Sequence, residues 1–166
     1  NRIRYKAIDA LGSLKPTDAV RPLLDALKDT DEYVRIYAIR ALGNFDLLGN
    51  EAIAEHLQPF LRDDDRQIRE LAVETLGKLK AKQAVGELKR LLQEDRADIR
   101  SKAATALGNI GEKTALPALR AALKDKLIEK EVILALGFLG DSAVVTDLRK
   151  ILHNGNPYAY YLRCLA

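Results

Sequence analysis

Residues 68–77 read IRELAVETLG, and similar stretches recur along the whole chain. The shared pattern is Val/Ile-Arg, an Ala three residues later, and a closing Leu-Gly. Good copies lie at 3–12, 34–43 and 99–108, a degraded copy lies at 128–137, and a sixth occupies 157–166. The closing leucines, Leu11, Leu42, Leu76, Leu107, Leu136 and Leu165, are 31, 34, 31, 29 and 29 residues apart. Self-similarity at this period predicts a stack of similar helical units rather than one closed globular core.

A second amphipathic helix is expected before each motif copy after the first. The best-fitting ranges are 18–28, 51–62, 83–93, 114–124 and 142–152. In the first of them, Leu23, Leu24 and Leu27 recur at helical spacing. Pro59 lies near the middle of its helix and predicts a kink there. The expected fold is all-α: a right-handed α-solenoid, or superhelix, of about five stacked antiparallel helix pairs.

The ends of the motif helices carry their own signals. A short acidic turn precedes the motif at Asp29-Thr30-Asp31, at Asp63-Asp64-Asp65 and at 95–98. Carboxylates in these turns are expected to cap the helix N-terminus and to favour the positive end of its dipole. The glycines that close the copies, Gly43, Gly77, Gly108 and Gly137, are expected to end the helices in a left-handed conformation.

Composition excludes several classes of protein. The 27 basic and 24 acidic residues leave a net charge of only +3, whereas nucleic-acid-binding domains usually show a strong basic excess. The single cysteine, Cys164, cannot form an intrachain disulfide, which favours a reducing compartment. The sequence shows no signal peptide and no apolar run approaching the ~20 residues that span a bilayer. We therefore expect a cytoplasmic location, no membrane partner and no nucleic acid.

The domain organisation follows from the repeats. Because each unit packs only on its neighbours, residues 1–166 are expected to form a single repeat domain. Stable solenoids end in units with a polar outer face, and neither end of this sequence has that character. The sequence is therefore expected to be a fragment of a longer chain.

The repeats resemble HEAT-like repeats of the short type named after phycobilisome lyases. Asp63-Asp64-Asp65 leading into Ile68-Arg69, followed by Ala72 and Leu76-Gly77, carry the resemblance, and the other copies have equivalents. Relatives of this type include bilin lyase subunits, assembly chaperones and binding scaffolds, so the resemblance leaves the function open. We expect a non-catalytic scaffold or assembly factor that binds another protein. The alternative is a bilin lyase subunit or phycobiliprotein chaperone.

An arginine recurs at one position of each good copy, and the series is Arg4, Arg35, Arg69 and Arg100. In a stack of repeats these side chains form a ladder. The ladder could be a basic strip for anionic ligands. We expect a structural role, because an acidic turn precedes Arg35, Arg69 and Arg100, and the guanidinium fork suits carboxylates and carbonyls.

Other candidates for chemistry are few. His56 and His153 are the only histidines, and Glu55-His56 is a single pair. A metal site needs three or four convergent ligands, so no metal and no other cofactor is expected. Cys164 occupies the position that alanine fills in most other copies, which predicts a packed residue rather than a nucleophile. No catalytic residue is expected, and the chain is not expected to be an enzyme.

The concave face of the solenoid is the expected binding surface. Helical spacing turns residues two, five and six places before each closing leucine away from the core. The predicted protein-binding residues are Tyr37, Arg40, Leu71, Glu74, Lys102, Leu134, Phe138 and Tyr160. Tyr37, Arg40 and Leu71 form its predicted centre, with Ile36 beside them, because contact surfaces favour aromatic residues and arginine. The mixture of basic and acidic residues on this face argues against a polyanion, and the sequence does not indicate an oligomeric state.

Overall fold

The computed structural model describes residues 2–45, 50–145 and 149, and within these ranges every regular element is a helix. The described motif copies are the helices α1 (Arg2–Leu14), α3 (Glu32–Leu42), α5 (Arg66–Lys78), α7 (Ala97–Ile110) and α9 (Glu129–Phe138). Five motif predictions are therefore confirmed to within a few residues. The sixth, at 157–166, lies outside the described residues.

The intervening helices are shorter, and most of them begin as a 3-10 turn. They are α2 (Val20–Ala26), α4 (Asn50–Leu57), α6 (Val85–Glu94) and α8 (Leu116–Ala122), called here the first helices of their repeats. The 3-10 turns Thr17–Ala19, Lys82–Ala84 and Lys113–Ala115 lead into α2, α6 and α8, and the turn Ser142–Val144 starts where a fifth first helix is expected.

Pro59 breaks its helix as predicted. The α-helix α4 ends at Leu57, and the chain continues to Arg62 as the 3-10 helix Gln58–Arg62. Proline has no N–H to donate, and its ring collides with the carbonyl group four residues earlier in an α-helix. The predicted kink is therefore a change from α to 3-10 geometry.

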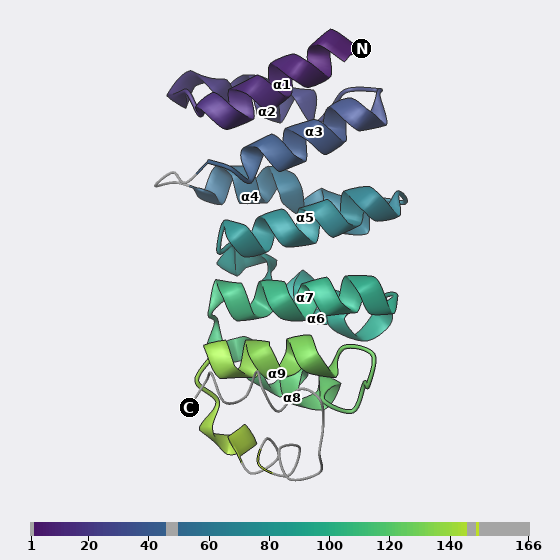
Figure 1. Cartoon of the computed structure of the whole chain (residues 1–166), viewed down its shortest axis with the longest axis vertical. Coiled ribbons are helices and arrows are strands. Elements are labelled where there is room, and N and C mark those ends of the chain that lie inside the picture. Colours follow the sequence, from purple (N-terminus) through teal and green to yellow (C-terminus); the bar gives the residue numbers. More distant parts are fainter. Residues whose placement is uncertain (1, 46–49, 146–148, 150–166) are drawn as a thin grey trace.

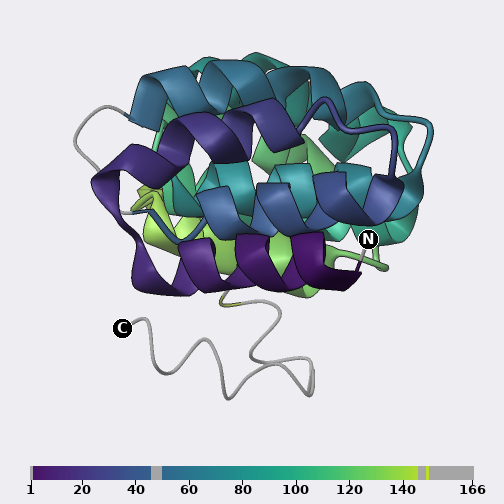
Figure 2. The ribbon, with the colours of Figure 1, turned by 90° about the horizontal axis from the view of Figure 1, so that it is seen from above.

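The helix pairs stack one after another along a single axis (Figure 1). The motif helices α1, α3, α5, α7 and α9 form one row, and the first helices form a second row behind it. The view along the stack shows these rows as two layers (Figure 2). Because contacts link mainly neighbouring helices, such as α5 with α7 and α6 with α7, the described chain is a helical solenoid.

A continuous apolar core lies between the two rows. The first apolar residue of the motif is buried in α3, α5 and α7, where Val34 is 2% exposed and Ile68 and Ile99 are fully buried. The closing leucines Leu42 and Leu76 are also fully buried. The pattern that defines the repeats is therefore the pattern of side chains that face this core.

The motif glycines do not adopt the left-handed conformation, so that prediction is wrong. Gly43 follows α3 with φ −67°, and Gly77 lies inside α5. The left-handed residues come three positions after motif glycines. They are Lys15, Lys80, Gly111 and Gly140, with φ of 50°, 52°, 80° and 66°.

The motif glycines instead allow neighbouring repeats to pack closely. A Cβ atom at Gly77 would lie 2.8 Å from the Cα atom of Ala106 in the next motif helix. At Gly12 it would lie 2.7 Å from the Cβ atom of Ala41. Real side chains essentially never approach this closely, so only glycine fits. At Gly12, Gly77 and Gly108 the sequence pattern Leu-Gly therefore records a helix–helix contact, and only Gly43 among the described motif glycines directly follows a helix end.

The acidic turns cap two of the three motif helices they precede. Asp31 accepts a hydrogen bond from the backbone N–H of Tyr33, and Asp65 accepts from the backbone N–H groups of Gln67 and Ile68. These caps satisfy N–H groups that have no partner within the helix. At α7 the residue before the helix is Arg96, and its side chain makes no capping hydrogen bond.

Candidate functional site

The ladder arginines first bind the backbone of the acidic turn in their own repeat. Nη1 of Arg35 donates to the carbonyl oxygens of Asp29 and Thr30, at 2.9 and 3.3 Å. Nη1 of Arg69 donates in the same way to the carbonyl oxygens of Asp63 and Asp64, at 2.7 and 3.0 Å. Each guanidinium group therefore closes the turn that leads into its own motif helix.

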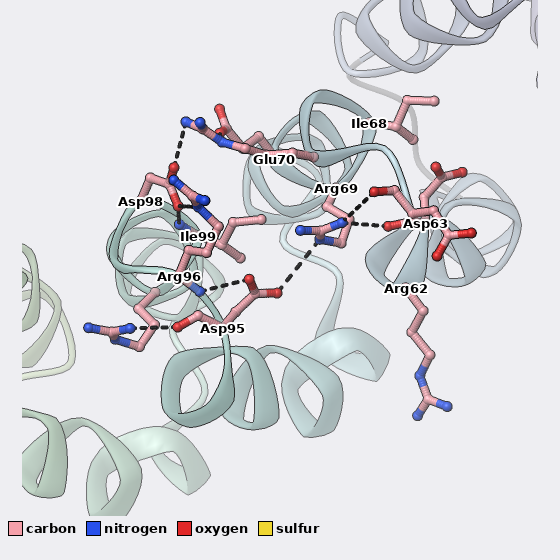
Figure 3. Close-up of polar contacts among 12 residues, drawn as sticks. Arg62, Asp63, Ile68, Arg69, Glu70, Asp95, Arg96, Asp98 and Ile99 are labelled. Carbon is pink, nitrogen blue, oxygen red and sulfur yellow. Dashed lines mark hydrogen bonds and ion pairs between the residues drawn. The ribbon is translucent and has the colours of Figure 1, made fainter.

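The side chains of Arg69 and Arg100 also reach the acidic turn of the following repeat. Nε of Arg69 lies 3.6 Å from Oδ2 of Asp95, and Figure 3 shows this guanidinium group between two acidic turns. Nε of Arg100 donates to Oδ2 of Asp125 at 2.8 Å. Burial disfavours the charged form of Asp125, but hydrogen bonds from Arg100 and from a backbone N–H hold the pKa of its carboxyl group below the ordinary value.

These contacts favour a structural role over a basic strip for ligands. The side chains of Arg69 and Asp95 are only 18% and 17% exposed. At the N-terminal end of the ladder, Nη1 of Arg4 lies 2.5 Å from Oδ2 of Asp29. The guanidinium groups of Arg69 and Arg100, each held between two neighbouring turns, offer few donors to an anion in solution. The structural role of the ladder stays a prediction, and a stability measurement tests it below.

Three tyrosines and an arginine gather on the row of motif helices, at α1 and α3. The rings of Tyr5 and Tyr37 are stacked, with centroids 5.5 Å apart and planes 9° apart. The ring of Tyr33 lies 6.2 Å from that of Tyr5, and Cζ of Arg40 lies 5.7 Å from the centre of the Tyr37 ring. The hydroxyl group of Tyr5 donates to Oδ2 of Asp31 at 2.8 Å, which links the rings to a helix cap. Tyr5, Tyr33, Tyr37 and Arg40 are called the tyrosine cluster below.

The predicted centre of the binding surface is only partly exposed. Arg40 is exposed, whereas Tyr37 and Leu71 are half-buried against the core. Ile36 is 4% exposed, so the expectation that it lies beside the open columns is wrong. The residue six places before the closing leucine faces the next repeat, since its counterpart Tyr5 packs on the rings of α3.

The middle of the same face is a network of ion pairs. Nζ of Lys78 lies 2.9 Å from Oε1 of Glu74, and Nζ of Lys102 lies 3.4 Å from Oε2 of Glu74. Nζ of Lys102 is also 3.9 Å from Oε2 of Glu70. The hydrogen bond from Lys78 is the main cause that lowers the pKa of the Glu74 carboxyl group. Glu74 and Lys102, both predicted site residues, thus lie together and balance one another's charge.

The remaining predicted residues lie further along the stack. Leu134 is half-buried and Phe138 is 64% exposed, and both belong to α9, which α5 and α7 separate from α3. Tyr160 lies outside the described residues. Of the predicted site residues, the structure therefore brings Tyr37 next to Arg40 and Glu74 next to Lys102.

Two members of the tyrosine cluster were missed in the sequence. Tyr5 stands six places before Leu11, in a column predicted to be open, and Tyr33 directly precedes the motif of its repeat. The sequence did carry a signal for both residues. Tyr5 stands in the column next to that of Tyr37, and Tyr33 stands four residues before Tyr37 on the same helix. Their stacking depends on the distance between α1 and α3, which the sequence does not state.

Other candidates for chemistry remain isolated where they can be described. His56 is exposed, and its Nδ1 atom lies 2.8 Å from the carbonyl oxygen of Ala52. Among residues 2–45, 50–145 and 149, no three His, Cys, Asp or Glu side chains are grouped so that they could hold a metal ion. His153 and Cys164 lie outside the described residues. Within the same ranges, every helix is too short or too polar to cross a bilayer.

Comparisons with known proteins agree with the repeat architecture. The family model for HEAT repeats matches residues 1–71, 54–127 and 97–160. The uncharacterized phycocyanin operon protein Y of Pseudanabaena tenuis is 33% identical over 90 residues, which are 54% of this chain and only 21% of the relative's length.

Solved structures show the same fold. The complex of CpcE and CpcF of phycocyanin lyase from Nostoc sp. PCC7120 matches with a TM-score of 0.74 and 24% identity, over 83% of this chain and 59% of the other. Human deoxyhypusine hydroxylase matches with a TM-score of 0.63 and 28% identity, over 73% of this chain and 43% of the other. A designed armadillo repeat protein in complex with the peptide (KR)4 matches with a TM-score of 0.67 and 19% identity, over 95% and 87% of the two chains. Because the HEAT-repeat matches cover nearly the whole sequence, the chain belongs to the HEAT-repeat family.

Proposed function

We propose that this chain is a non-catalytic scaffold that binds another protein through its row of motif helices. The tyrosine cluster is the observation that carries the proposal. Only 5% of the chain is aromatic, yet three of its six tyrosines gather on one face with an arginine beside them. Rigid aromatic rings and arginine are the residues that dominate binding energy at protein interfaces.

The neighbouring surface supports a protein rather than a polyanion as the partner. Leu71 of α5 continues the cluster with an apolar side chain, and the ion pairs of Glu74, Lys78 and Lys102 follow it. An apolar centre beside a polar, charge-balanced rim is the usual anatomy of a protein–protein interface. A nucleic acid would need several unpaired basic residues on this face.

The test compares variants of the cluster in capture experiments from the native cells, with bound proteins quantified by mass spectrometry. Changing Tyr37, Arg40 and Leu71 together to alanine removes the proposed centre, and we expect capture of the specific partner to fall by about tenfold or more. Because Tyr37 and Leu71 also contact the core, circular dichroism must show that the variant is folded. The pair Tyr33→Ala and Arg40→Glu changes only exposed side chains and serves as the second variant.

A matched control lies on the opposite face of the solenoid. Arg21→Glu makes the same change of charge as Arg40→Glu at an exposed position of α2 and should leave capture unaltered. Unaltered capture by both folded cluster variants would remove this surface as the binding site.

The second candidate is a bilin lyase subunit or phycobiliprotein chaperone. It is favoured by the similarity to the phycocyanin operon protein and to the phycocyanin lyase complex. The two functions differ in a direct observation. A lyase subunit incubated with a linear tetrapyrrole should take up the pigment and show its absorbance after gel filtration, whereas a plain scaffold should remain colourless.

A further inference from the structure

A groove runs between α6 and α8 on the face of the first helices, opposite the row of motif helices. It consists of two adjoining hollows of 530 and 490 Å³, which share Gln93, Ala118 and Ala121 in their walls. Both helices belong to the described part of the stack. Close packing of the motif helices leaves the outer helices further apart, and the groove is the space between them.

The floor of the groove is apolar and shallow. Leu92 of α6 and Ala118, Ala121 and Ala122 of α8 contribute to it. Alanine side chains allow the backbone of a third helix to approach, so that its larger apolar side chains fill the space between α6 and α8. Such a floor suits an apolar ridge of a helix.

The rim of the groove is basic. Lys89 lines one hollow and Lys124 lines the other, and neither is paired with a carboxylate among the described residues. The acidic Asp125 is already bound by Arg100, with Nη2 and Oδ2 2.6 Å apart. Arg90 is held by Glu87, with Nη2 and Oε1 2.6 Å apart. The charges that remain available at the rim are therefore those of lysines.

The groove between α2 and α4 shows that this charge pattern is not general. Its hollows of 360 and 500 Å³ are lined by both acidic and basic residues, among them Asp18, Asp25, Glu55, Arg21 and Lys28. That groove has no preference for one sign of charge. The basic rim is a property of the α6–α8 groove.

We propose that the α6–α8 groove binds an amphipathic α-helix of a partner protein, with apolar residues along one ridge and acidic residues on both flanks. The ridge fills the floor, and the acidic flanks pair with Lys89 and Lys124. Two unpaired lysines cannot supply the repeated phosphate contacts that a nucleic acid needs. This site lies on the face opposite the tyrosine cluster, so its test is independent of the proposed function.

The probe is a fluorescein-labelled, hydrocarbon-stapled synthetic helix of about 15 residues, because an unrestrained peptide of this length is only marginally helical. It carries leucines at helical spacing on one face and glutamates on both flanks. Fluorescence anisotropy with the whole chain should show saturable binding that weakens with added salt. The double variant Lys89→Glu and Lys124→Glu should weaken binding by about tenfold, since each rim charge contributes modestly.

Two further variants separate charge from shape. Ala121→Trp fills the floor at an exposed position and should abolish binding, while circular dichroism shows an unchanged helix content. Lys28→Glu is the matched control, because Lys28 and Lys124 each directly precede the Asp of an acidic turn, and it should leave binding unchanged.

Several outcomes would overturn the proposal. They are the absence of binding at about millimolar peptide, equal binding of a matched peptide with lysine flanks, and unchanged binding by the groove variants. Tighter binding of a double-stranded oligonucleotide than of the peptide would assign the groove to a polyanion instead. Loss of capture in the tyrosine-cluster variants with retained peptide binding would leave this inference intact.

Discussion

Four described residues that stand three places after a motif glycine, Lys15, Lys80, Gly111 and Gly140, adopt a left-handed backbone. Lys80 and Gly111 occupy this position in successive repeats, with φ of 52° and 80°. A side chain in this region clashes with its own backbone, and glycine avoids the clash. The same geometry therefore has a different energy in the two repeats.

This difference predicts opposite effects of two exchanges. Lys80→Gly should stabilise the fold by about 0.5–1 kcal/mol, because the relief of strain exceeds the entropy that glycine adds to the unfolded chain. Gly111→Lys should destabilise it by a similar amount. Chemical denaturation of the two variants measures both effects, and a loss of stability in Lys80→Gly would contradict the argument.

The arginine ladder makes a second prediction at this scale. Arg69→Ala should lower the free energy of unfolding by about 1–3 kcal/mol, because it leaves the carbonyl groups of Asp63 and Asp64 and the carboxylate of Asp95 without their partner. Urea denaturation measures the change. Arg69→Lys should recover little of it, since a single ammonium group cannot span both turns. An unchanged unfolding midpoint together with lost ligand binding would show that the ladder is functional.

At the scale of helices, the two rows pack differently. The motif helices approach until a Cβ atom at Gly77 or Gly108 would lie 2.8 or 2.9 Å from a Cα atom of the next motif helix. The first helices leave hollows of several hundred cubic ångströms between α2 and α4 and between α6 and α8. This difference favours the row of motif helices as the inner, concave side of the stack.

The close approach predicts how two glycines respond to the same change. Gly77→Ala should destabilise the chain by about 1–3 kcal/mol, because the new methyl group collides with Ala106 and separates two repeats. Gly86→Ala is the matched control in α6, where a Cβ atom would meet nothing within 4 Å. It should stabilise the helix by up to about 1 kcal/mol. Thermal unfolding of both variants tests the pair, and equal responses would contradict the packing role of Gly77.

At the scale of the whole molecule, ion pairs join repeats across the outer row. Arg62, at the end of one first helix, donates to both carboxylate oxygens of Glu87 in α6, from Nε at 2.9 Å and from Nη2 at 3.0 Å. Arg90 donates to the same carboxylate. The hydrogen bond from Arg62, followed by that from Arg90, lowers the pKa of Glu87 to about 2. Glu87 is thus charged in the folded chain under conditions where it would be protonated in the unfolded chain.

This pKa predicts a loss of stability in acid. The contribution of Glu87 is complete above its ordinary pKa near 4.5 and falls as the pH drops from there to about 2, because the unfolded chain binds the proton first. Urea midpoints measured between neutral pH and pH 2 should show this decline. In Glu87→Gln the decline over this interval should be smaller, and an identical pH profile in both proteins would contradict the prediction.

The helices that form and the side chains that face the core were predictable from local pattern. Apolar residues at helical spacing located the motif helices because burial of one face is what stabilises them. The position of Pro59 predicted where its helix breaks, because a proline disturbs only the helical turn around it. The conformation of the motif glycines was predicted wrongly, since the same residue serves helix ends and close packing, and only the position of Ala106 distinguishes the two.

The surface features could not be predicted from local pattern, because they depend on how the repeats stack. Tyr5, Tyr33 and Tyr37 form a cluster because α1 and α3 lie within ring-stacking distance, and the sequence lists these residues without their separation. Ile36 is buried for the same reason, since the neighbouring repeat covers its column. The sequence by itself determined the repeat, its helices and its core, because these follow from interactions within about one repeat length. Only the tertiary structure decided which side chains meet across repeats and where the outer helices leave grooves, because these depend on the distances and angles between helices.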